Sequence, residues 1–276
     1  MLAGRAAPGV LARAPRLRWI QALTAGVEGW LALPDLPAQV ALTGARGTHR
    51  IAMPENILGA LFHLTKPYAA AARDQRERRW TRRVSVPLAG KTLGIIGLGA
   101  IGVEVARKAA ALEMSVIGVR RAPEPVPHVD RVYGPDEADR VLAASDFVLL
   151  LLPVTPETRG YMSRARLALM KPSAYLLNFG RGELIVDADL IEAVKARTIA
   201  GAVLDVFTTE PLPAEHPFWG TEGIAVLPHI GGVHPQRDRV VAELFVENLS
   251  RFLDGRPLLH AVDRTRGIDG LPWRRA

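Results

Sequence analysis

The sequence predicts an α/β fold in which a doubly wound parallel sheet is accompanied by a second, smaller domain. Three observations support this: strand and helix patterns alternate from residue 88 onward, several strand-like runs are continuously apolar, and the chain has 276 residues. Alternation of this kind is typical of parallel strands joined by right-handed helical crossovers. A chain of this length can form two domains or one large one.

Each element follows from its local pattern. The runs VLLLL and YLLN are apolar throughout, as expected for strands that helices cover on both faces. We expect strands of this sheet at 92–97, 115–119, 146–152, 174–178, 201–205 and 225–227. We expect helices at 101–112, 135–144, 163–169 and 187–197, and a last amphipathic helix at 236–253. Two early strands, near 17–23 and 40–43, precede a helical stretch over 54–72 that Pro67 divides.

A glycine motif follows the first strand of the alternating region. The run LGIIGLGAIG places Gly97, Gly99 and Gly102 in the spacing GxGxxG between a strand and a helix. In a Rossmann sheet these glycines allow a tight turn, close approach of a pyrophosphate and packing of helix on strand. Ala100 and Ile101 would then open the helix whose N-terminus faces the phosphates. The alternative is an ordinary strand-to-helix turn that binds nothing.

Composition excludes several classes of site. The chain has no cysteine, which rules out disulfides, thiolate catalysis and cysteine-based metal sites, and we expect no metal. The formal net charge is +7, and no apolar run approaches the roughly 18–20 residues that span a bilayer. The most basic segment, RDQRERRWTRR at 73–83, carries arginines around Trp80. It could be a nucleic-acid patch, but Asp74 and Glu77 interrupt the charge and favour a solvated connecting helix.

Residues 1–27 are rich in arginine and alanine and contain no acidic residue. This resembles an organelle transit peptide, but the run from Leu17 to Leu23 alternates like a strand that enters a turn at Gly26. We therefore interpret the segment as folded structure, and the cytoplasm is the expected location.

Several predicted strands end in clusters of polar residues, which should meet at one edge of the sheet. Arg181 follows the strand at 174–178, Glu210 follows the strand at 201–205, and His229 follows the strand at 225–227. An arginine can bind a carboxylate with two parallel hydrogen bonds, and a histidine paired with a carboxylate can donate a proton near neutral pH. Taken singly, each could be a surface turn residue, a solvated acid or a strand cap. Their convergence favours an acid–base site.

The chain resembles the D-isomer-specific 2-hydroxyacid dehydrogenase family over nearly its whole length. The matching stretches, in the family's order, are LARAPRLRWIQALTAGVEGW, LGIIGLGAIG, LLPVTPETRG, NFGRGELIVDADL, AVLDVFTTEPLP and LPHIGG. The resemblance implies an enzyme, commonly a homodimer, that reduces 2-oxoacids to D-2-hydroxyacids with a nicotinamide cofactor. It also implies a flavodoxin-like substrate domain beside the Rossmann domain.

The family's motifs assign roles to particular residues. They place the carboxylate-binding arginine on Arg181, the orienting glutamate on Glu210 and the acid/base histidine on His229. Arg46 and Gly47 match the loop whose backbone N–H groups bind the substrate carboxylate. The cofactor would also contact Pro153, Thr158 and Asp205, the last at the nicotinamide amide.

The cofactor preference follows from a departure at the second strand. NAD enzymes place an acid about 20 residues beyond the glycines to bind the ribose 2′-hydroxyl. Here the strand ends in Arg120 and Arg121, which would attract a 2′-phosphate. We therefore expect NADP(H) to be preferred, with NAD(H) possible if the arginines stack on adenine or face solvent.

The resemblance also sets the expected domains. We expect a partial substrate domain with the connecting helix at 1–84, the dinucleotide-binding domain at 85–233, and a C-terminal helix and tail at 234–276 that return to the first domain. About ten residues precede the first matching stretch, where the family usually has further strand–helix units. A wrongly assigned start and a natural truncation both explain this. Gly44 also stands where the family usually has asparagine.

The leading functional hypothesis is an NADPH-dependent reductase of a small 2-oxoacid such as glyoxylate or hydroxypyruvate. One alternative is an NAD-linked dehydrogenase of a bulkier D-2-hydroxyacid. Another is a non-catalytic nucleotide sensor that resembles a corepressor. We expect neither a nucleic acid nor a membrane as a partner.

Overall fold

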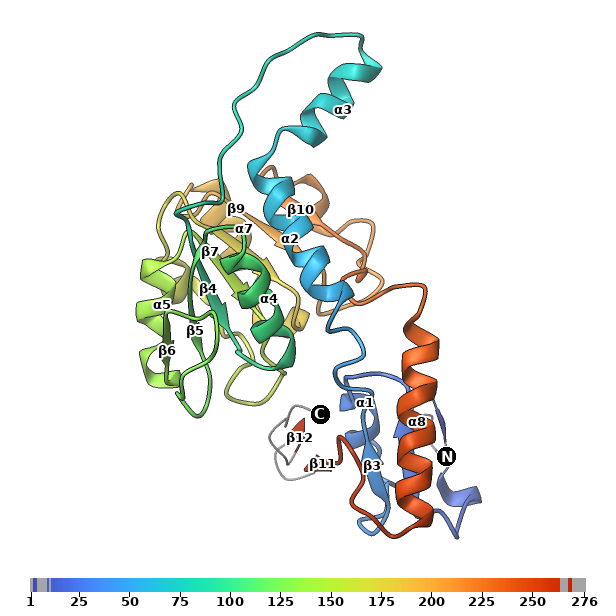
Figure 1. Cartoon of the computed structure of the whole chain (residues 1–276). Helices are drawn as coiled ribbons and strands as arrows, with labels where there is room; N and C mark the ends of the chain where they lie inside the picture. Colours follow the sequence, from blue (N-terminus) through green and yellow to red (C-terminus); the bar gives the residue numbers. More distant parts are fainter. Residues whose placement is uncertain (1, 4–8, 10, 264–267, 270–276) are drawn as a thin grey trace. The chain divides into compact units, whose positions relative to one another are not determined.

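The computed structural model describes residues 2–3, 9, 11–263 and 268–269 (Figure 1). It divides into two compact units, one formed by Met1–His49 with Val233–Ala276 and the other by Arg50–Gly232. The chain thus passes between the units twice, at 49/50 and at 232/233.

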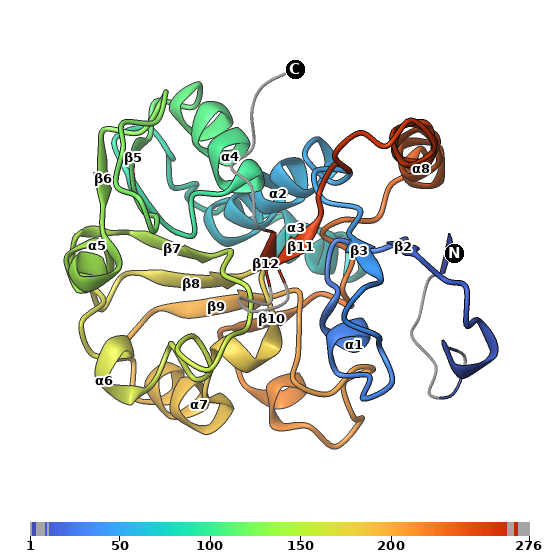
Figure 2. The same cartoon turned by 90° about the horizontal axis from the view of Figure 1, so that it is seen from below.

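The unit formed by Arg50–Gly232 is built on a parallel sheet of seven strands, in the order β10-β9-β8-β7-β4-β5-β6 (Figure 2). The strands are β4 (Thr92–Ile96), β5 (Ser115–Val119), β6 (Arg131–Tyr133), β7 (Phe147–Leu150), β8 (Tyr175–Asn178), β9 (Gly201–Leu204) and β10 (Ile224–Val226). The chain runs outward from β4 to β6, returns to β7 on the other side of β4, and continues to β10. The predicted doubly wound sheet is therefore confirmed.

Helices cover both faces of this sheet (Figure 2). Alternate strand residues pack into the two core layers between sheet and helices. On one face Ile95 and Leu149 pack with α2 (Ala52–Thr65) and α4 (Ala100–Ala110). On the other face Ile96 and Leu150 pack with α5 (Ala138–Ala144), α6 (Arg164–Leu167) and α7 (Asp187–Lys195). Burial on both faces is why these strands lack polar alternation. Short 3-10 turns complete the unit, namely η2 (Pro135–Glu137), η3 (Gly182–Leu184) and η4 (Pro217–Gly220).

The expected boundary of the first domain, at residue 84, differs from the boundary at Arg50 where the second compact unit begins. In α2, Ile57 and Leu61 are fully buried in the core that contains Val105 and Ala106 of α4. Residues 50–84, which we assigned to the first domain, are therefore grouped with the seven-stranded sheet. The apolar face of α2 is evident in the sequence, but the helix that it packs against is not.

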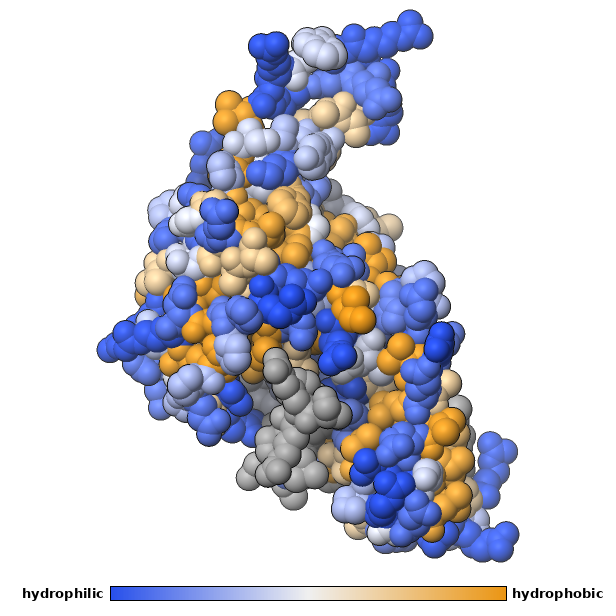
Figure 3. All heavy atoms as spheres, viewed as in Figure 1, coloured by the Kyte–Doolittle hydropathy of each residue, from blue (hydrophilic) through white to orange (hydrophobic). Residues whose placement is uncertain are grey.

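Residues 67–85, here called the arm, form an excursion whose two flanking segments are hydrogen-bonded to each other. The N–H of Val86 donates to the carbonyl of Thr65, and Lys66 Nζ donates to the carbonyl of Val86. The arm contains α3 (Tyr68–Arg76) and an extended segment, and it projects away from the sheet (Figure 1). Figure 3 shows that its surface is mainly hydrophilic, in agreement with its arginines. Pro67 ends the preceding helical stretch as predicted.

The other unit contains a parallel sheet of β1 (Leu2–Ala3), β2 (Trp19–Ala22) and β3 (Ala41–Thr43), with η1 (Leu11–Arg13), α1 (Glu28–Leu31) and α8 (Arg237–Leu253). A small antiparallel pair is formed by β11 (Val262–Asp263) and β12 (Ile268–Asp269). Trp19 stacks on Phe245 and Phe252 of α8. Asn248 of α8 is fully buried and donates to Gln21 Oε1 at 2.9 Å. These contacts fix α8 on the strands.

The expected folded segment at 1–27 contains η1 and β2, while residues 1, 4–8 and 10 lie outside the described part. The strand β6 was not predicted, because its residues include the charged Arg131 and lack the apolar run that marks β10, the other three-residue edge strand. Within the described ranges, no helix is both long and apolar enough to span a membrane.

Candidate active site

The glycine motif forms the turn from β4 into α4. Gly97 has φ +114°, and a Cβ there would lie 2.9 Å from the carbonyl carbon of Leu151, so only glycine fits. Gly99 directly precedes α4, Ala100 and Ile101 form its first turn, and Gly102 is buried within it. The turn lies where strand order reverses, between β4 and β7. This is where doubly wound sheets bind their ligands.

Arg120 and Arg121 follow β5 beside this turn. The carbonyl of Val119, the last residue of β5, accepts hydrogen bonds from the N–H groups of both Gly97 and Leu98. Arg120 is half-buried and Arg121 is exposed. Arg120 and Arg121 therefore come directly after Val119, the residue whose carbonyl is hydrogen-bonded to the glycine turn. The pKa of Glu157 is lowered mainly by a hydrogen bond with Thr155, and Arg121 adds a smaller favourable charge.

Pro153 and Thr158 belong to a turn after β7. The hydroxyl of Thr158 donates to the carbonyl of Pro153 at 2.7 Å and accepts from the N–H of Thr155 at 2.7 Å. The turn is thus closed by one side chain, and it begins on the strand that adjoins β4.

Arg181 lies in a turn after β8 that Asn178 holds. Asn178 is fully buried, its Nδ2 donates to the carbonyl of Arg181 at 2.8 Å, and its Oδ1 accepts from the N–H of Gly180 at 3.1 Å. The next residue, Gly182, lies so close to the backbone of Phe207 that a Cβ would collide with it. The Arg181 turn therefore packs directly on the loop that follows β9.

Glu210 and His229 form a hydrogen-bonded pair across that loop and the one after β10. His229 Nδ1 lies 2.6 Å from Glu210 Oε2, and Glu210 Oε1 accepts from the N–H of Phe207 at 2.9 Å. The His229 side chain is 50% exposed, so its ring reaches solvent while it is held by the carboxylate. Its backbone adopts φ +53°, a conformation that is uncommon outside glycine and that occurs often at functional sites.

Asp205 stabilises the turn that carries His229 by accepting hydrogen bonds from its backbone. It is 1% exposed, and its two carboxylate oxygens accept from the N–H groups of Ile230 at 2.8 Å and Gly231 at 2.9 Å. Burial raises the pKa of Asp205, although both backbone hydrogen bonds and the charge of His229 act in the opposite direction. The residue thus holds the turn that follows His229.

Arg181, Asp205, Glu210 and His229 all follow the carboxyl ends of the adjacent strands β8, β9 and β10. Hydrogen bonds join His229 to Glu210 and the backbone after His229 to Asp205. Arg46 and Gly47 lie in the other unit, in the loop after β3, where Gly47 has φ +80°. Their role with Arg181 stays a prediction. Sequence reasoning missed two supporting residues, Asn178 and Asn56, the second of which donates to the turn after His229.

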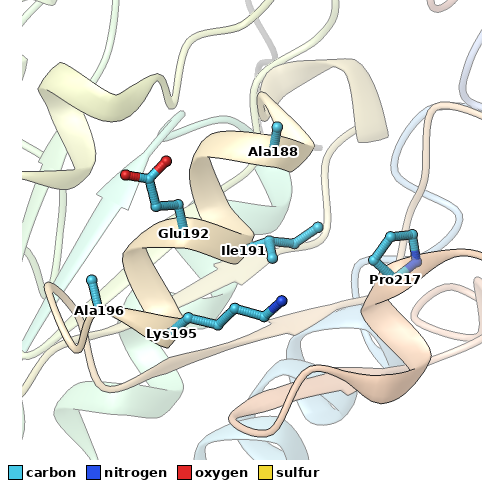
Figure 4. A pocket seen from close by; sticks show the side chains of 6 residues that line it. All are labelled: Ala188, Ile191, Glu192, Lys195, Ala196 and Pro217. Atoms are coloured by element: carbon cyan, nitrogen blue, oxygen red, sulfur yellow. The ribbon is translucent and has the colours of Figure 1, made fainter.

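A surface pocket of about 580 Å³ lies elsewhere, along α7 and beside η4 (Figure 4). Ala188, Ile191, Glu192, Lys195, Ala196 and Pro217 line it. Ile191 and Lys195 point toward Pro217, while Glu192 pairs with Arg164 of α6. The pocket contains none of the predicted site residues, and we assign it no role.

The residues at the strand ends fit a dinucleotide. The turn at Gly97 has no room for a Cβ, and the N-terminus of α4 that follows it presents backbone N–H groups to a pyrophosphate. The parallel sheet and this turn define the class of dinucleotide-binding α/β proteins.

Comparison with known proteins narrows the class. Residues 58–231 match the family model described as "D-isomer specific 2-hydroxyacid dehydrogenase, NAD binding domain". Glyoxylate/hydroxypyruvate reductase A of Serratia proteamaculans is 34% identical over 230 residues, which cover 81% of this chain and 74% of that protein.

Solved structures agree with this result. A D-isomer specific 2-hydroxyacid dehydrogenase from Xanthobacter autotrophicus, in complex with NADPH and MES, matches with a TM-score of 0.87 and 34% identity over 96% of this chain and 84% of that one. An NADPH-dependent glyoxylate/hydroxypyruvate reductase from Sinorhizobium meliloti, in complex with NADP and sulfate, matches with a TM-score of 0.86 and 33% identity over 96% and 85%. The chain belongs to the D-isomer specific 2-hydroxyacid dehydrogenase family and is an NAD(P)-dependent oxidoreductase.

Proposed function

We propose that the protein reduces a small 2-oxoacid of the glyoxylate or hydroxypyruvate kind to the D-2-hydroxyacid, with NADPH as the preferred reductant. The observation that carries the proposal is the 2.6 Å pair of His229 Nδ1 and Glu210 Oε2. It lies at the edge of the sheet where the glycine turn also lies. The relatives named as glyoxylate/hydroxypyruvate reductases support the substrate class.

Each residue has a role in this reaction. Arg181 binds the substrate carboxylate with its guanidinium group and orients the carbonyl, aided by the backbone N–H groups of Arg46 and Gly47. When bound, the cofactor supplies a hydride to the carbonyl carbon. The carbonyl oxygen takes a proton from His229 Nε2, because Nδ1 is engaged by Glu210. Positioning and the charge of Arg181 supply most of the rate enhancement.

The cofactor is held by the turns around the switch point. Gly97 allows the tight turn and Gly102 allows α4 to pack on β4, so that Gly99, Ala100 and Ile101 present backbone to the pyrophosphate. Pro153 and Thr158 help to hold the cofactor, and Asp205 contacts the nicotinamide amide. The preference for NADP(H) over NAD(H) rests on Arg120 and Arg121, which follow the strand end that is hydrogen-bonded to the glycine turn. A 2′-phosphate is attracted by two guanidinium groups there. The NADPH and NADP complexes of two similar structures support this preference.

We further propose that the protein works as a homodimer in the cytoplasm, and that the arm contacts a second copy of the chain. Trp80 is 92% exposed and Val84 is 89% exposed, although both are large and apolar. Exposed apolar side chains on a projecting segment are typical of an interface. The variant Trp80→Ala/Val84→Asp should shift the mass in solution from dimer to monomer, whereas Trp219→Ala, at a 55% exposed site on η4, should not.

The direct test of the reaction is NADPH or NADH oxidation, followed at the nicotinamide absorbance with glyoxylate or hydroxypyruvate. The proposal predicts turnover that is faster with NADPH. Turnover only with NADH and a larger 2-oxoacid would instead support an NAD-linked dehydrogenase of a bulkier substrate. Cofactor binding without turnover of any 2-oxoacid would contradict the reductase and support a nucleotide sensor.

A further inference from the structure

The turn that carries His229 lies directly before the chain leaves its unit. Residues 229–232 follow β10, and the chain passes into the other unit at 232/233. His229 has φ +53°, and its N–H donates to the carbonyl of Leu227 at 3.0 Å. Such a conformation persists only when the surrounding structure determines it strongly. The contacts of the turn therefore decide where the imidazole points.

One side of this turn is held by Asp205 and the other by Asn56 of α2. Asp205 accepts one hydrogen bond from the N–H of Ile230 and one from the N–H of Gly231. Asn56 Nδ2 donates to both carbonyls, that of Gly231 at 2.9 Å and that of Ile230 at 3.3 Å. The N–H and C=O groups of the two residues after His229 are thus all bound by two side chains. An amide NH2 group suits this place because it carries two donors.

Asn56 lies on α2, a helix that is packed into the core of this unit. The neighbouring Ile57 is fully buried in the core shared with α4, and Glu55 Oε1 lies 3.1 Å from Lys108 Nζ of α4. The helix begins at Ala52, just after the chain enters this unit at residue 50. Asn56 lies just after the point where the chain enters this unit, and Gly231 lies just before the point where it leaves, 175 residues later. The hydrogen bond between them therefore links the two ends of the unit.

We propose that Asn56 is a positioning residue that sets the orientation of His229 through the carbonyls of Ile230 and Gly231. The role of His229 as proton donor rests on the proposed function, whereas the effect of Asn56 on the turn does not. A displaced turn moves the imidazole relative to the reacting carbonyl, and a shift of about 1 Å can cost roughly 100-fold in rate. Asn56 would affect the chemical step and leave the phosphate end of the cofactor site unchanged.

Two variants remove the donor in different ways. Asn56→Leu keeps the approximate size of the side chain but removes the amide and its donors, and Asn56→Asp keeps a polar side chain but presents oxygens to the two carbonyls. Glu55→Gln is the matched control, because it changes the neighbouring position on the same helix and weakens a link to α4 instead. If one Asn56 variant fails to fold, the other decides.

The first readout is hydrogen exchange of the Ile230 and Gly231 amides, which needs no substrate. We expect exchange to speed up by about tenfold in both Asn56 variants, because the turn opens more easily once its two carbonyls lose the hydrogen bonds from Asn56, and to stay unchanged in Glu55→Gln. The second readout is steady-state kinetics with the 2-oxoacid. There we expect kcat to fall about 10- to 100-fold while KM for NADPH changes less than about twofold.

Unchanged exchange at both amides would overturn the inference, and so would faster exchange together with an unchanged kcat. An equal rise of KM for NADPH and loss of kcat would also overturn it, because that pattern indicates general loosening of the unit. If the unmodified protein reduces no 2-oxoacid, the proposed function fails, and the exchange experiment alone decides whether Asn56 holds the turn.

Discussion

His229 Nδ1 lies 2.6 Å from Glu210 Oε2, and the other oxygen of that carboxylate accepts the N–H of Phe207. Glu210 is therefore fixed by the backbone of its own loop while it orients the imidazole on the next one. A carboxylate on one ring nitrogen fixes the ring orientation and directs the other nitrogen outward. The geometry suits a histidine that gives a proton to a substrate in front of it.

Replacing Glu210 by glutamine should impair the chemical step. The glutamine side chain could still accept the N–H of Phe207, but it carries no charge to stabilise the imidazolium. We expect kcat to fall by about 100- to 10,000-fold, with cofactor binding retained. Steady-state kinetics and an NADPH titration would measure both quantities. Glu215→Gln, at an exposed position on the same loop, is the control and should behave like the unmodified protein.

Replacing Arg181 by lysine should separate charge from geometry. Lysine keeps the positive charge but cannot form two parallel hydrogen bonds to a carboxylate. We expect kcat/KM for the 2-oxoacid to fall by about 100-fold, the effect of losing one preorganised donor, and KM for NADPH to change little. Full activity in this variant would show that the Arg181 side chain does not bind the substrate in the proposed way.

Replacing Arg120 and Arg121 together by alanine should change the cofactor preference. Loss of charge-assisted hydrogen bonds to the 2′-phosphate should lower kcat/KM for NADPH by about 10- to 100-fold, with kcat/KM for NADH little changed. The ratio of the two values is the measurement. Arg140→Ala, at an exposed arginine of α5, removes charge elsewhere and should leave the ratio as it is. An unchanged ratio in the double variant would refute the cofactor assignment.

Asp74 should stabilise the arm in a pH-dependent way. Its side chain is 5% exposed and pairs with Arg79 and Arg83, and the hydrogen bond from Arg83 lowers the pKa of Asp74. A carboxyl whose pKa is lowered on folding contributes its full stabilisation at a pH above its ordinary pKa of about 3.9. This stabilisation is lost as the pH falls through the lower pKa of the folded state.

The melting temperature of Asp74→Asn should therefore lie below that of the unmodified protein at pH 7. The difference should shrink progressively as the pH falls below about 4. Asp254→Asn, at an exposed carboxylate that pairs with Arg256, should show no such difference at either pH. A difference for Asp74→Asn that persists unchanged in acid would mean that ionisation of this carboxyl is not its cause.

The sequence predicted much of the seven-stranded sheet because strands buried on both faces leave long apolar runs. The run from Val148 to Leu150 is such a case, with no exposed residue. The edge strand β6 was missed because the charged Arg131 interrupts its apolar pattern, whereas β10, an edge strand of the same length, is apolar throughout. The contacts of α2 could not be predicted either, since an apolar helix face does not identify its partner.

The candidate site was predictable where its residues follow strands, because parallel strands end at one edge. Arg181, Glu210 and His229 were predicted in this way. Asn56 was not, because it contacts the His229 turn from a helix and lies 175 residues before Gly231 in the sequence. The support from Asn178 was missed for another reason, since a buried asparagine at a strand end has no pattern that distinguishes it from a turn residue.

The most direct test of the account compares the unmodified protein with His229→Ala in one assay of NADPH oxidation by glyoxylate or hydroxypyruvate. Both proteins should bind NADPH with similar affinity, because His229 follows β10 and the glycine turn follows β4. The variant should lose about 100-fold or more in turnover, as expected when a general acid is removed. Equal turnover by the two proteins would contradict the assignment of His229 as the proton donor.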